Sequence, residues 1–282
     1  MVGAPDRQAV KVVRQETFIT YAIPGPIFLR SVRTLGSLTC RLTQLTARMN
    51  NQSFTGSSRR RGVLALVLLL PAPTVGVAFG MIWFLDTAMG TAVFALSKIW
   101  VFALPAVWLT VVDKKSLSWS RPKQGGFGIA ALLGIVMSAA VVLVYSVMPD
   151  ETLNTERLRT AVLAVGLDSP GKYLAGAAYW IAVNSVLEEY VWRWFVIRQI
   201  RTISTASVAV AGSAAAFTVH HIVAMQVYLS WPLVTLASTG IFLGAVTWSW
   251  CYVRFQSVWP GYLSHAIVDV AVFAVGYTVL FT

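Results

Sequence analysis

Three short polar sequences, each set within a run of apolar residues, hold the side chains of this chain that are best suited to chemistry. They are Glu188-Glu189-Tyr190-Val191-Trp192-Arg193, Phe217-Thr218-Val219-His220-His221 and His265-Ala266-Ile267-Val268-Asp269. All 3 histidines of the protein lie within them. An ionisable side chain near the centre of a membrane helix costs roughly 2.5–3.5 kcal/mol on insertion scales. Because apolar segments keep such groups where they pair, line a cavity or react, these sequences predict one buried polar site, interpreted as catalytic.

The two adjacent glutamates are expected to have different roles. Glu189 precedes Arg193 by four residues, which places both side chains on one helix face in the favoured order of acid and base. A buried pair of this kind offsets much of the cost of desolvation, so it is interpreted as structural. Glu188 is rotated by about 100° from Glu189 and lacks that partner. It is therefore predicted to be a general base that accepts a proton from water.

Two imidazoles can complete the site. Phe217 lies one helical turn before His221 and can back its ring against water. Asp269 follows His265 by four residues and can orient that imidazole by accepting a hydrogen bond. His220, offset by one residue from His221, is interpreted as a contact between helices.

Two reaction chemistries are open to these residues. In the first, Glu188 and one histidine activate water directly, while the other histidine and Asp269 stabilise the oxyanion. In the second, Glu188, His221 and His265 ligate a divalent metal such as zinc, whose bound water is the nucleophile.

Composition indicates which elements must position these side chains. Of 282 residues, 57% are hydrophobic and only 12% are charged, where soluble proteins have about 25% charged residues. With a mean hydropathy of +0.69, the chain is predicted to be an all-α, polytopic transmembrane helical bundle. Cys40 and Cys251 are too few and too far apart for a disulfide framework or a thiolate metal site.

The chain divides into a basic extension and a membrane domain. Residues 1–62 hold ten Lys or Arg residues against two acidic ones. Their composition fits an organellar transit peptide, a disordered arm attracted to anionic lipid, or a start codon assigned too early. No folded basic surface with stacking aromatics is indicated, so nucleic acid is not an expected partner.

The membrane domain, 63–282, contains about seven apolar segments of spanning length. They lie near 63–85, 88–112, 127–148, 173–197, 205–224, 232–252 and 257–281. Basic residues of the connecting loops gather on one side, which the positive-inside rule assigns to the cytoplasm. They are Arg59–Arg61, Lys114, Lys115, Arg121, Lys123, Arg198, Arg201 and Arg254. The N-terminus is therefore predicted to be cytoplasmic and the C-terminus outside, and the loop 149–172 is long enough for a short interfacial helix.

The ordered motifs EExxxR, FxxxH and HxxxN/D resemble those of the CPBP family of intramembrane proteases. This family includes the type II CAAX prenyl endopeptidases and the bacteriocin-processing or bacteriocin-immunity proteins. The resemblance covers about residues 125–282. It implies that Glu188 and His221 activate the hydrolytic water and that His265 with Asp269 stabilises the oxyanion. The third motif ends in Asp where the prenyl endopeptidases most often have Asn, which favours ring orientation or metal ligation as the role of Asp269.

The leading hypothesis is a multi-pass intramembrane endopeptidase, of metalloprotease or glutamate type. It would hydrolyse peptide bonds of membrane-anchored substrates near the cytoplasmic leaflet of the lipid bilayer. The alternative is a non-proteolytic membrane scaffold or bacteriocin-immunity factor that keeps the polar cluster to hold its helices together. A proton-coupled transporter is a weaker third hypothesis, since transporters usually show duplicated halves and this sequence shows no internal repeat.

Overall fold

The computed structural model describes residues 56–149 and 152–282, which form helices and no strands. This confirms the predicted all-α fold. The predictions for residues 1–55 lie outside the described residues. Among the described residues, the first helix begins at Gly56 and continues past position 63, where the membrane domain was predicted to start.

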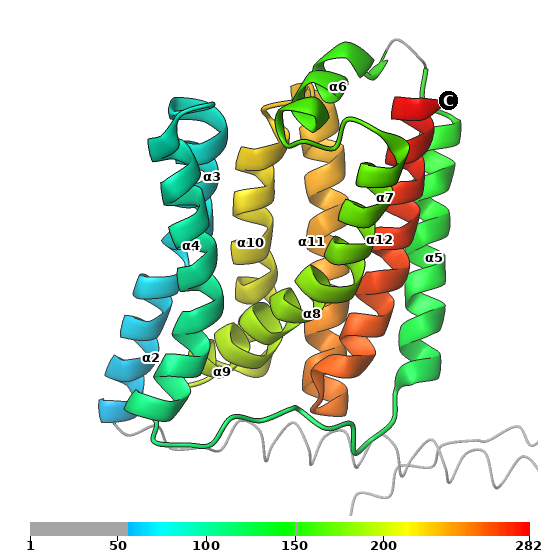
Figure 1. The fold of residues 1–282 in the computed structure, drawn as a ribbon. Helices are drawn as coiled ribbons and strands as arrows, with labels where there is room; N and C mark the ends of the chain where they lie inside the picture. The colour runs from blue at the N-terminus through cyan, green and yellow to red at the C-terminus, as the bar shows by residue number, and fades with distance from the viewer. Residues whose placement is uncertain (1–55, 150–151) are drawn as a thin grey trace, which may run out of the picture. The chain divides into compact units, whose positions relative to one another are not determined.

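The bundle is built from long helices, several of which contain π-helical turns (Figure 1). In chain order the elements are α2 (Gly56–Leu69), α3 (Pro71–Ala78), η1 (Phe79–Trp83), α4 (Ala88–Val107), η2 (Trp108–Val112), α5 (Phe127–Ser146), α6 (Thr155–Ala164), α7 (Pro170–Tyr179), η4 (Trp180–Asn184), α8 (Ser185–Glu188), η5 (Glu189–Val196), α9 (Ile197–Ile200), α10 (Ala206–Met225), α11 (Trp231–Phe255) and α12 (Val258–Phe281).

Among the described residues, six helices are long and apolar enough to cross a membrane. They are Gly56–Trp83, Ala88–Val112, Phe127–Ser146, Ala206–Met225, Trp231–Phe255 and Val258–Phe281, close to six of the seven predicted spans. The seventh, near 173–197, falls in the helical run from α7 to α9, which is not among the six. The run from α7 to α9 differs from the six helices in that it carries Glu188, Glu189 and Arg193 within two turns.

The run from α7 to α9 crosses the bundle obliquely and passes in front of α11 and α12 in Figure 1. Its residues change from α-helical to π-helical at Trp180 and again at Glu189. π-Helical turns are rare and occur frequently at functional sites. The second π-helical segment, η5, holds Glu189 and Arg193 of the first motif.

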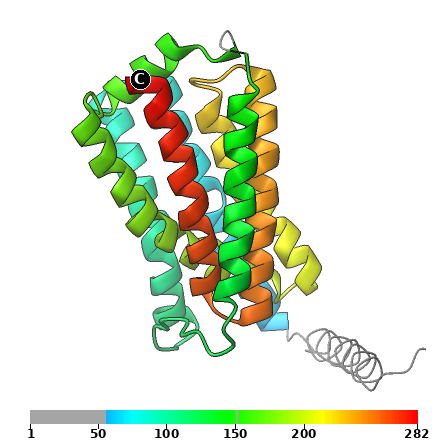
Figure 2. The same cartoon turned by 90° about the vertical axis from the view of Figure 1, so that its right-hand side faces the viewer.

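The close pairing of α5 with α12 forms one wall of the bundle, as Figure 2 shows. Gly134 of α5 permits this approach, since a Cβ atom there would lie 3.0 Å from the carbonyl oxygen of Ser264. Ser138 of α5 donates a hydrogen bond of 3.0 Å to the carbonyl oxygen of Ile267. α5 thereby supports α12 at the level of the third motif.

The segment that precedes α5 forms hydrogen bonds with the beginning of α12. Ser257 Oγ donates to the carbonyl oxygen of Ser120 at 2.6 Å, and the backbone N–H of Val258 donates to Ser120 Oγ at 3.0 Å. The indole N–H of Trp259 donates to the carbonyl oxygen of Trp119 at 2.9 Å. These bonds satisfy part of the helix N-terminus and fix the entry of α12 into the bundle.

The basic connecting segments gather at one end of the bundle, the lower end in Figure 1, where α2 begins and α11 ends. The opposite end carries α6, the loop between α10 and α11, and the C-terminus. α6 occupies the loop that was expected to hold a short interfacial helix. The grouping of charge matches the predicted arrangement of loops about the membrane.

Candidate active site

The first motif is divided between a buried ion pair and a partly open carboxylate. Glu189 and Arg193 both have fully buried side chains, and Arg193 Nη1 lies 3.4 Å from Glu189 Oε1. Glu188, the last residue of α8, keeps 13% of its side chain exposed. The structure therefore places the two adjacent glutamates in different environments.

Aromatic rings from two other helices enclose Arg193. Its guanidinium carbon lies 4.6 Å from the ring centroid of Phe217 in α10 and 5.1 Å from that of Trp248 in α11. Such cation–π contacts strengthen when the cation is removed from water. Arg193 thus ties the oblique helix to α10 and α11 while it pairs with Glu189.

His265 of α12 is held between an aromatic ring and the carboxylates. Its ring stacks on Trp248 with centroids 3.9 Å apart, and its Nδ1 lies 3.1 Å from Glu189 Oε1. Its Nε2 faces Glu188 Oε2 at 3.9 Å and Asp269 Oδ1 at 3.7 Å, which is beyond hydrogen-bond distance. Glu189 therefore supports His265 as well as Arg193, a second role that the spacing of the first motif did not indicate.

Asp269 is oriented by a residue that the sequence did not single out. Ser185 Oγ of α8 lies 2.5 Å from Asp269 Oδ2 and 2.8 Å from the carbonyl oxygen of Trp180, five residues earlier. The π-helical turn η4 brings that carbonyl to the hydroxyl. Asp269 lies one turn after His265, as predicted, but its hydrogen-bonding partner is Ser185.

His221 is fixed by the residue one turn before it. Its Nδ1 lies 2.8 Å from the carbonyl oxygen of Phe217, and the two rings are 4.5 Å apart between centroids. A carbonyl oxygen only accepts, so Nδ1 carries the proton and Nε2 of the neutral ring is free to accept one. Phe217 thus positions His221 through both its backbone and its ring.

His220 makes a contact between helices and also lies next to the candidate site. Its ring stacks on Trp192 at 5.4 Å and lies 4.2 Å from the ring of His221. Among the described residues, Glu188, His220 and His221 form a group whose potential ligand atoms all lie within 4.8 Å of one another. The predicted metal set contained His265 in place of His220.

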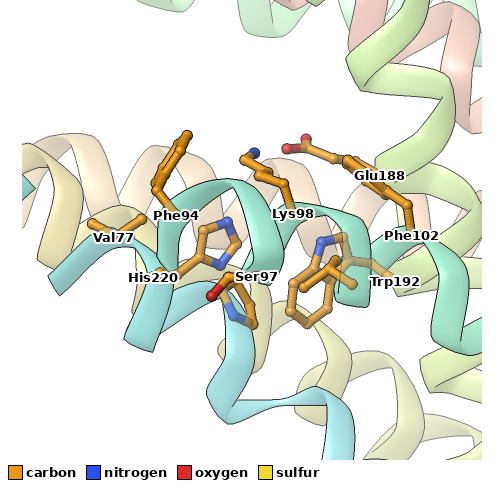
Figure 3. A pocket seen from close by; sticks show the side chains of 11 residues that line it. Val77, Phe94, Ser97, Lys98, Phe102, Glu188, Trp192 and His220 are labelled. Atoms are coloured by element: carbon orange, nitrogen blue, oxygen red, sulfur yellow. The ribbon is translucent and has the colours of Figure 1, made fainter. Parts of the chain in front are cut away.

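A cavity beside this cluster is lined by two helices from the N-terminal half of the bundle. Its wall includes Phe94, Ser97 and Lys98 of α4 together with Glu188 and His220. Figure 3 shows the Lys98 ammonium and the Glu188 carboxylate at this cavity. The sequence signal for Lys98 was a lone cation in the middle of the predicted span 88–112, which was overlooked.

The arrangement places two imidazoles with different partners, His221 and His265, near Glu188, and it places Glu188 and Lys98 in the wall of one cavity. Glu188 and His221 can accept protons, whereas His265 and Lys98 can donate hydrogen bonds or balance negative charge. Such a set can activate water and stabilise an anion formed next to it.

Comparison with known proteins gives one family. Residues 170–271 match the family model described as type II CAAX prenyl endopeptidase Rce1-like, a narrower range than the 125–282 expected from the motifs. The matched segment contains all three motifs but neither α3 nor α4. No curated protein and no solved structure matches the chain.

Proposed function

Because the chain belongs, through residues 170–271, to the Rce1-like family of type II CAAX prenyl endopeptidases, we propose that it hydrolyses peptide bonds of membrane-anchored substrates with Glu188 as general base. The family is one of intramembrane proteases, and the six apolar helices make this chain an integral multi-pass membrane protein. The observation that supports this proposal most is the separation of Glu188 from the buried pair of Glu189 and Arg193. It leaves one carboxylate at the cavity free to react.

In the proposed reaction, water bound between Glu188 and His221 loses a proton to Glu188 as it attacks the peptide carbonyl. His221 accepts a hydrogen bond from that water through Nε2, because its Nδ1 is engaged by Phe217. The amide nitrogen then takes the proton from Glu188 when the peptide bond breaks. In this reaction His221 keeps the tautomer that its hydrogen bond to the carbonyl oxygen of Phe217 favours.

The oxyanion is assigned to the space in front of His265 Nε2. This nitrogen donates a hydrogen bond when the imidazole carries two protons, and Glu189 accepts the bond from Nδ1. The carboxylates of Glu188 and Asp269 also face this ring and stabilise its positive charge. Removal of a single oxyanion donor typically lowers kcat by roughly 10²–10³-fold.

In the metal-dependent alternative, three neighbouring side chains are the candidate ligands. Glu188, His220 and His221 would hold a divalent ion, and such an ion, when bound, would generate a hydroxide-like nucleophile at neutral pH. We favour the direct mechanism because Lys98 lines the same cavity, and an ammonium beside a dication is unfavourable.

The test is cleavage of a membrane-anchored peptide by protein purified in detergent. We expect wild type to release two fragments and Glu188→Gln to release none, since the amide keeps the volume of the side chain but cannot accept the proton. Glu156→Gln in the exposed helix α6 is the matched control and is expected to behave as wild type. Activity of Glu188→Gln at the wild-type rate would refute the assignment. Without any cleavage by wild type, the scaffold hypothesis would gain.

A chelator separates the two mechanisms. Hydrolysis by the direct mechanism is expected to continue after chelation and dialysis. A metal-dependent reaction would stop and would return when zinc is added, with about one ion bound per chain.

A further inference from the structure

Lys98 is a cation placed within an apolar membrane helix. It lies near the middle of Ala88–Val112, between Phe94 and Phe102, whose ring centroids are 5.9 and 5.8 Å from its Nζ. A lysine at such a position is costly and is retained when it pairs or acts at a polar site. The two rings hold the ammonium by cation–π contact, but α4 itself contains no acidic residue that could serve as its counter-ion.

Glu188 is the acidic residue that lines the same cavity as Lys98. α4 packs against η5, the helical segment that follows Glu188 in the chain. Figure 3 shows the charged ends of Lys98 and Glu188 at this cavity. The other polar residues of this wall are Ser97 and His220, which carry no negative charge. Glu188 is therefore the acidic group of the cavity wall that can balance the Lys98 ammonium.

We propose that Lys98 supplies the counter-charge of Glu188 and of the oxyanion that forms during hydrolysis. α4, which lies outside the matched segment 170–271, would thereby complete the catalytic centre. This rests on the proposed peptidase reaction. The Lys98 ammonium offsets the cost of holding a carboxylate among apolar side chains and keeps Glu188 ready to accept a proton.

The charge balance of the reaction explains why one fixed cation is sufficient. As the water oxygen bonds to the carbonyl carbon, Glu188 takes a proton and the carbonyl π electrons move to oxygen. Glu188 becomes neutral while the oxyanion gains the negative charge, so the total charge beside Lys98 is unchanged. When the C–N bond breaks, the carbonyl re-forms, the amine leaves with the proton from Glu188, and the carboxylate is restored.

The activity test compares Lys98→Met with Leu96→Ala, which alters an exposed residue of the same helix outside the cavity. We expect Lys98→Met to lower kcat by roughly 10²-fold, similar to loss of an oxyanion donor, with KM nearly unchanged. Leu96→Ala is expected to retain wild-type kcat. Equal kcat values for the two variants would overturn the proposal.

Chemical rescue distinguishes the charge from the side-chain volume. Lys98→Cys is expected to have low kcat and to regain activity after treatment with bromoethylamine, which restores an ammonium on a chain of nearly the same length. Treated wild type controls for alkylation of Cys40 and Cys251. If treated Lys98→Cys remains as slow as the untreated variant, although mass spectrometry shows that the introduced thiol is alkylated, a role for the charge is refuted.

A stability cycle tests the pairing without a peptidase assay. Tm is measured in detergent for wild type, Lys98→Met, Glu188→Gln and the double variant. Pairing predicts that Lys98→Met lowers Tm less in the Glu188→Gln background than in wild type. Additive Tm shifts would refute the pairing. If wild type hydrolyses no peptide, the proposed function fails, and this cycle still decides whether Lys98 and Glu188 interact.

Discussion

The contact between Ser185 and Asp269 indicates a role for Asp269 that could not be inferred from its residue type alone. A hydroxyl has one proton, so Ser185 cannot donate to Asp269 Oδ2 and to the carbonyl oxygen of Trp180 at the same time. An amide nitrogen at the position of Oδ2 would donate to Ser185 Oγ and leave the hydroxyl proton for Trp180. The site is therefore suited to Asn as well as to Asp.

We predict that Asp269→Asn retains most of the wild-type kcat, whereas Asp269→Ala loses roughly 10²-fold, because the alanine leaves both Ser185 and His265 without a partner on this side. Steady-state hydrolysis of a membrane-anchored peptide measures the difference. Equal losses in the two variants would show that the negative charge of Asp269, and not its hydrogen bonding, is required.

Arg193 has a structural role, because it pairs with the buried Glu189. Arg193→Ala leaves the buried Glu189 without its cation and empties the space between Phe217 and Trp248. We expect the free energy of unfolding to fall by roughly 3–5 kcal/mol, as for other broken buried pairs. Denaturant unfolding in detergent measures the loss, and Glu188→Gln is expected to be much more stable than Arg193→Ala.

Arg198→Ala is the matched control for Arg193→Ala. Arg198 lies in the same helical run and its guanidinium carbon is 4.9 Å from the ring centroid of Trp194, a contact that involves no carboxylate. Its removal is expected to cost at most about 1 kcal/mol, the range of an exposed cation–π contact. Similar losses for the two arginines would mean that the Glu189–Arg193 pair adds nothing to stability.

At the scale of elements, the site depends on how closely α12 approaches η5. A Cβ atom on Gly261 of α12 would lie 2.8 Å from Glu189 Oε2. Glu189 is fully buried and its carboxylate contacts Arg193 and His265, so a displacement of this carboxylate would disturb both contacts. Gly261 is thus the residue that allows Glu189 to reach His265.

Gly261→Ala is predicted to lower kcat by roughly 10²-fold while the protein remains folded, because a shift of about 1 Å in a catalytic group has an effect of this size. Gly240→Ala in α11 is the control, since a Cβ there has no heavy atom within 4 Å. Rates are compared on the same peptide, with Tm as a check of folding. Unchanged kcat for Gly261→Ala would show that Glu189 does not position His265.

The sequence predicted the elements of the site better than their local geometry. The spacing of Glu189 and Arg193, of Phe217 and His221, and of His265 and Asp269 is a property of any helix, so these contacts could be inferred. The π-helical turns η4 and η5 could not, because hydropathy does not distinguish them from α-helix. Ser185 was missed for this reason, since its contact to Trp180 requires η4.

At the scale of the whole molecule, the sequence pattern predicted where the helices lie in the chain. It did not predict which helices far apart in the chain pack against one another. Lys98 was missed because its importance depends on α4 packing against residues of the matched segment 170–271, a contact between residues far apart in the chain. The apolar composition predicted the spans themselves, and side chains such as Leu96, Leu132 and Leu243 remain exposed on the outside of the bundle, where lipid would cover them.

The distribution of charge between the two ends of the bundle predicts its orientation. Single cysteines are introduced in a Cys40→Ala background at Lys115, on the basic end, and at Lys172, on the opposite end; both lysines are exposed. We expect an impermeant maleimide to label Lys172→Cys in intact cells and Lys115→Cys only after permeabilisation, because basic loops stay in the cytoplasm. The reverse pattern would invert the proposed topology.

Hydrolysis in water enriched with oxygen-18 tests the central claim most directly. Wild-type protein in proteoliposomes is incubated with a membrane-anchored peptide, and the fragments are analysed by mass spectrometry. The account predicts one heavy oxygen in the new carboxylate of the amino-side fragment from wild type, and no fragments from Glu188→Gln. Intact peptide after incubation with folded wild type, or heavy fragments from Glu188→Gln at the wild-type rate, would contradict it.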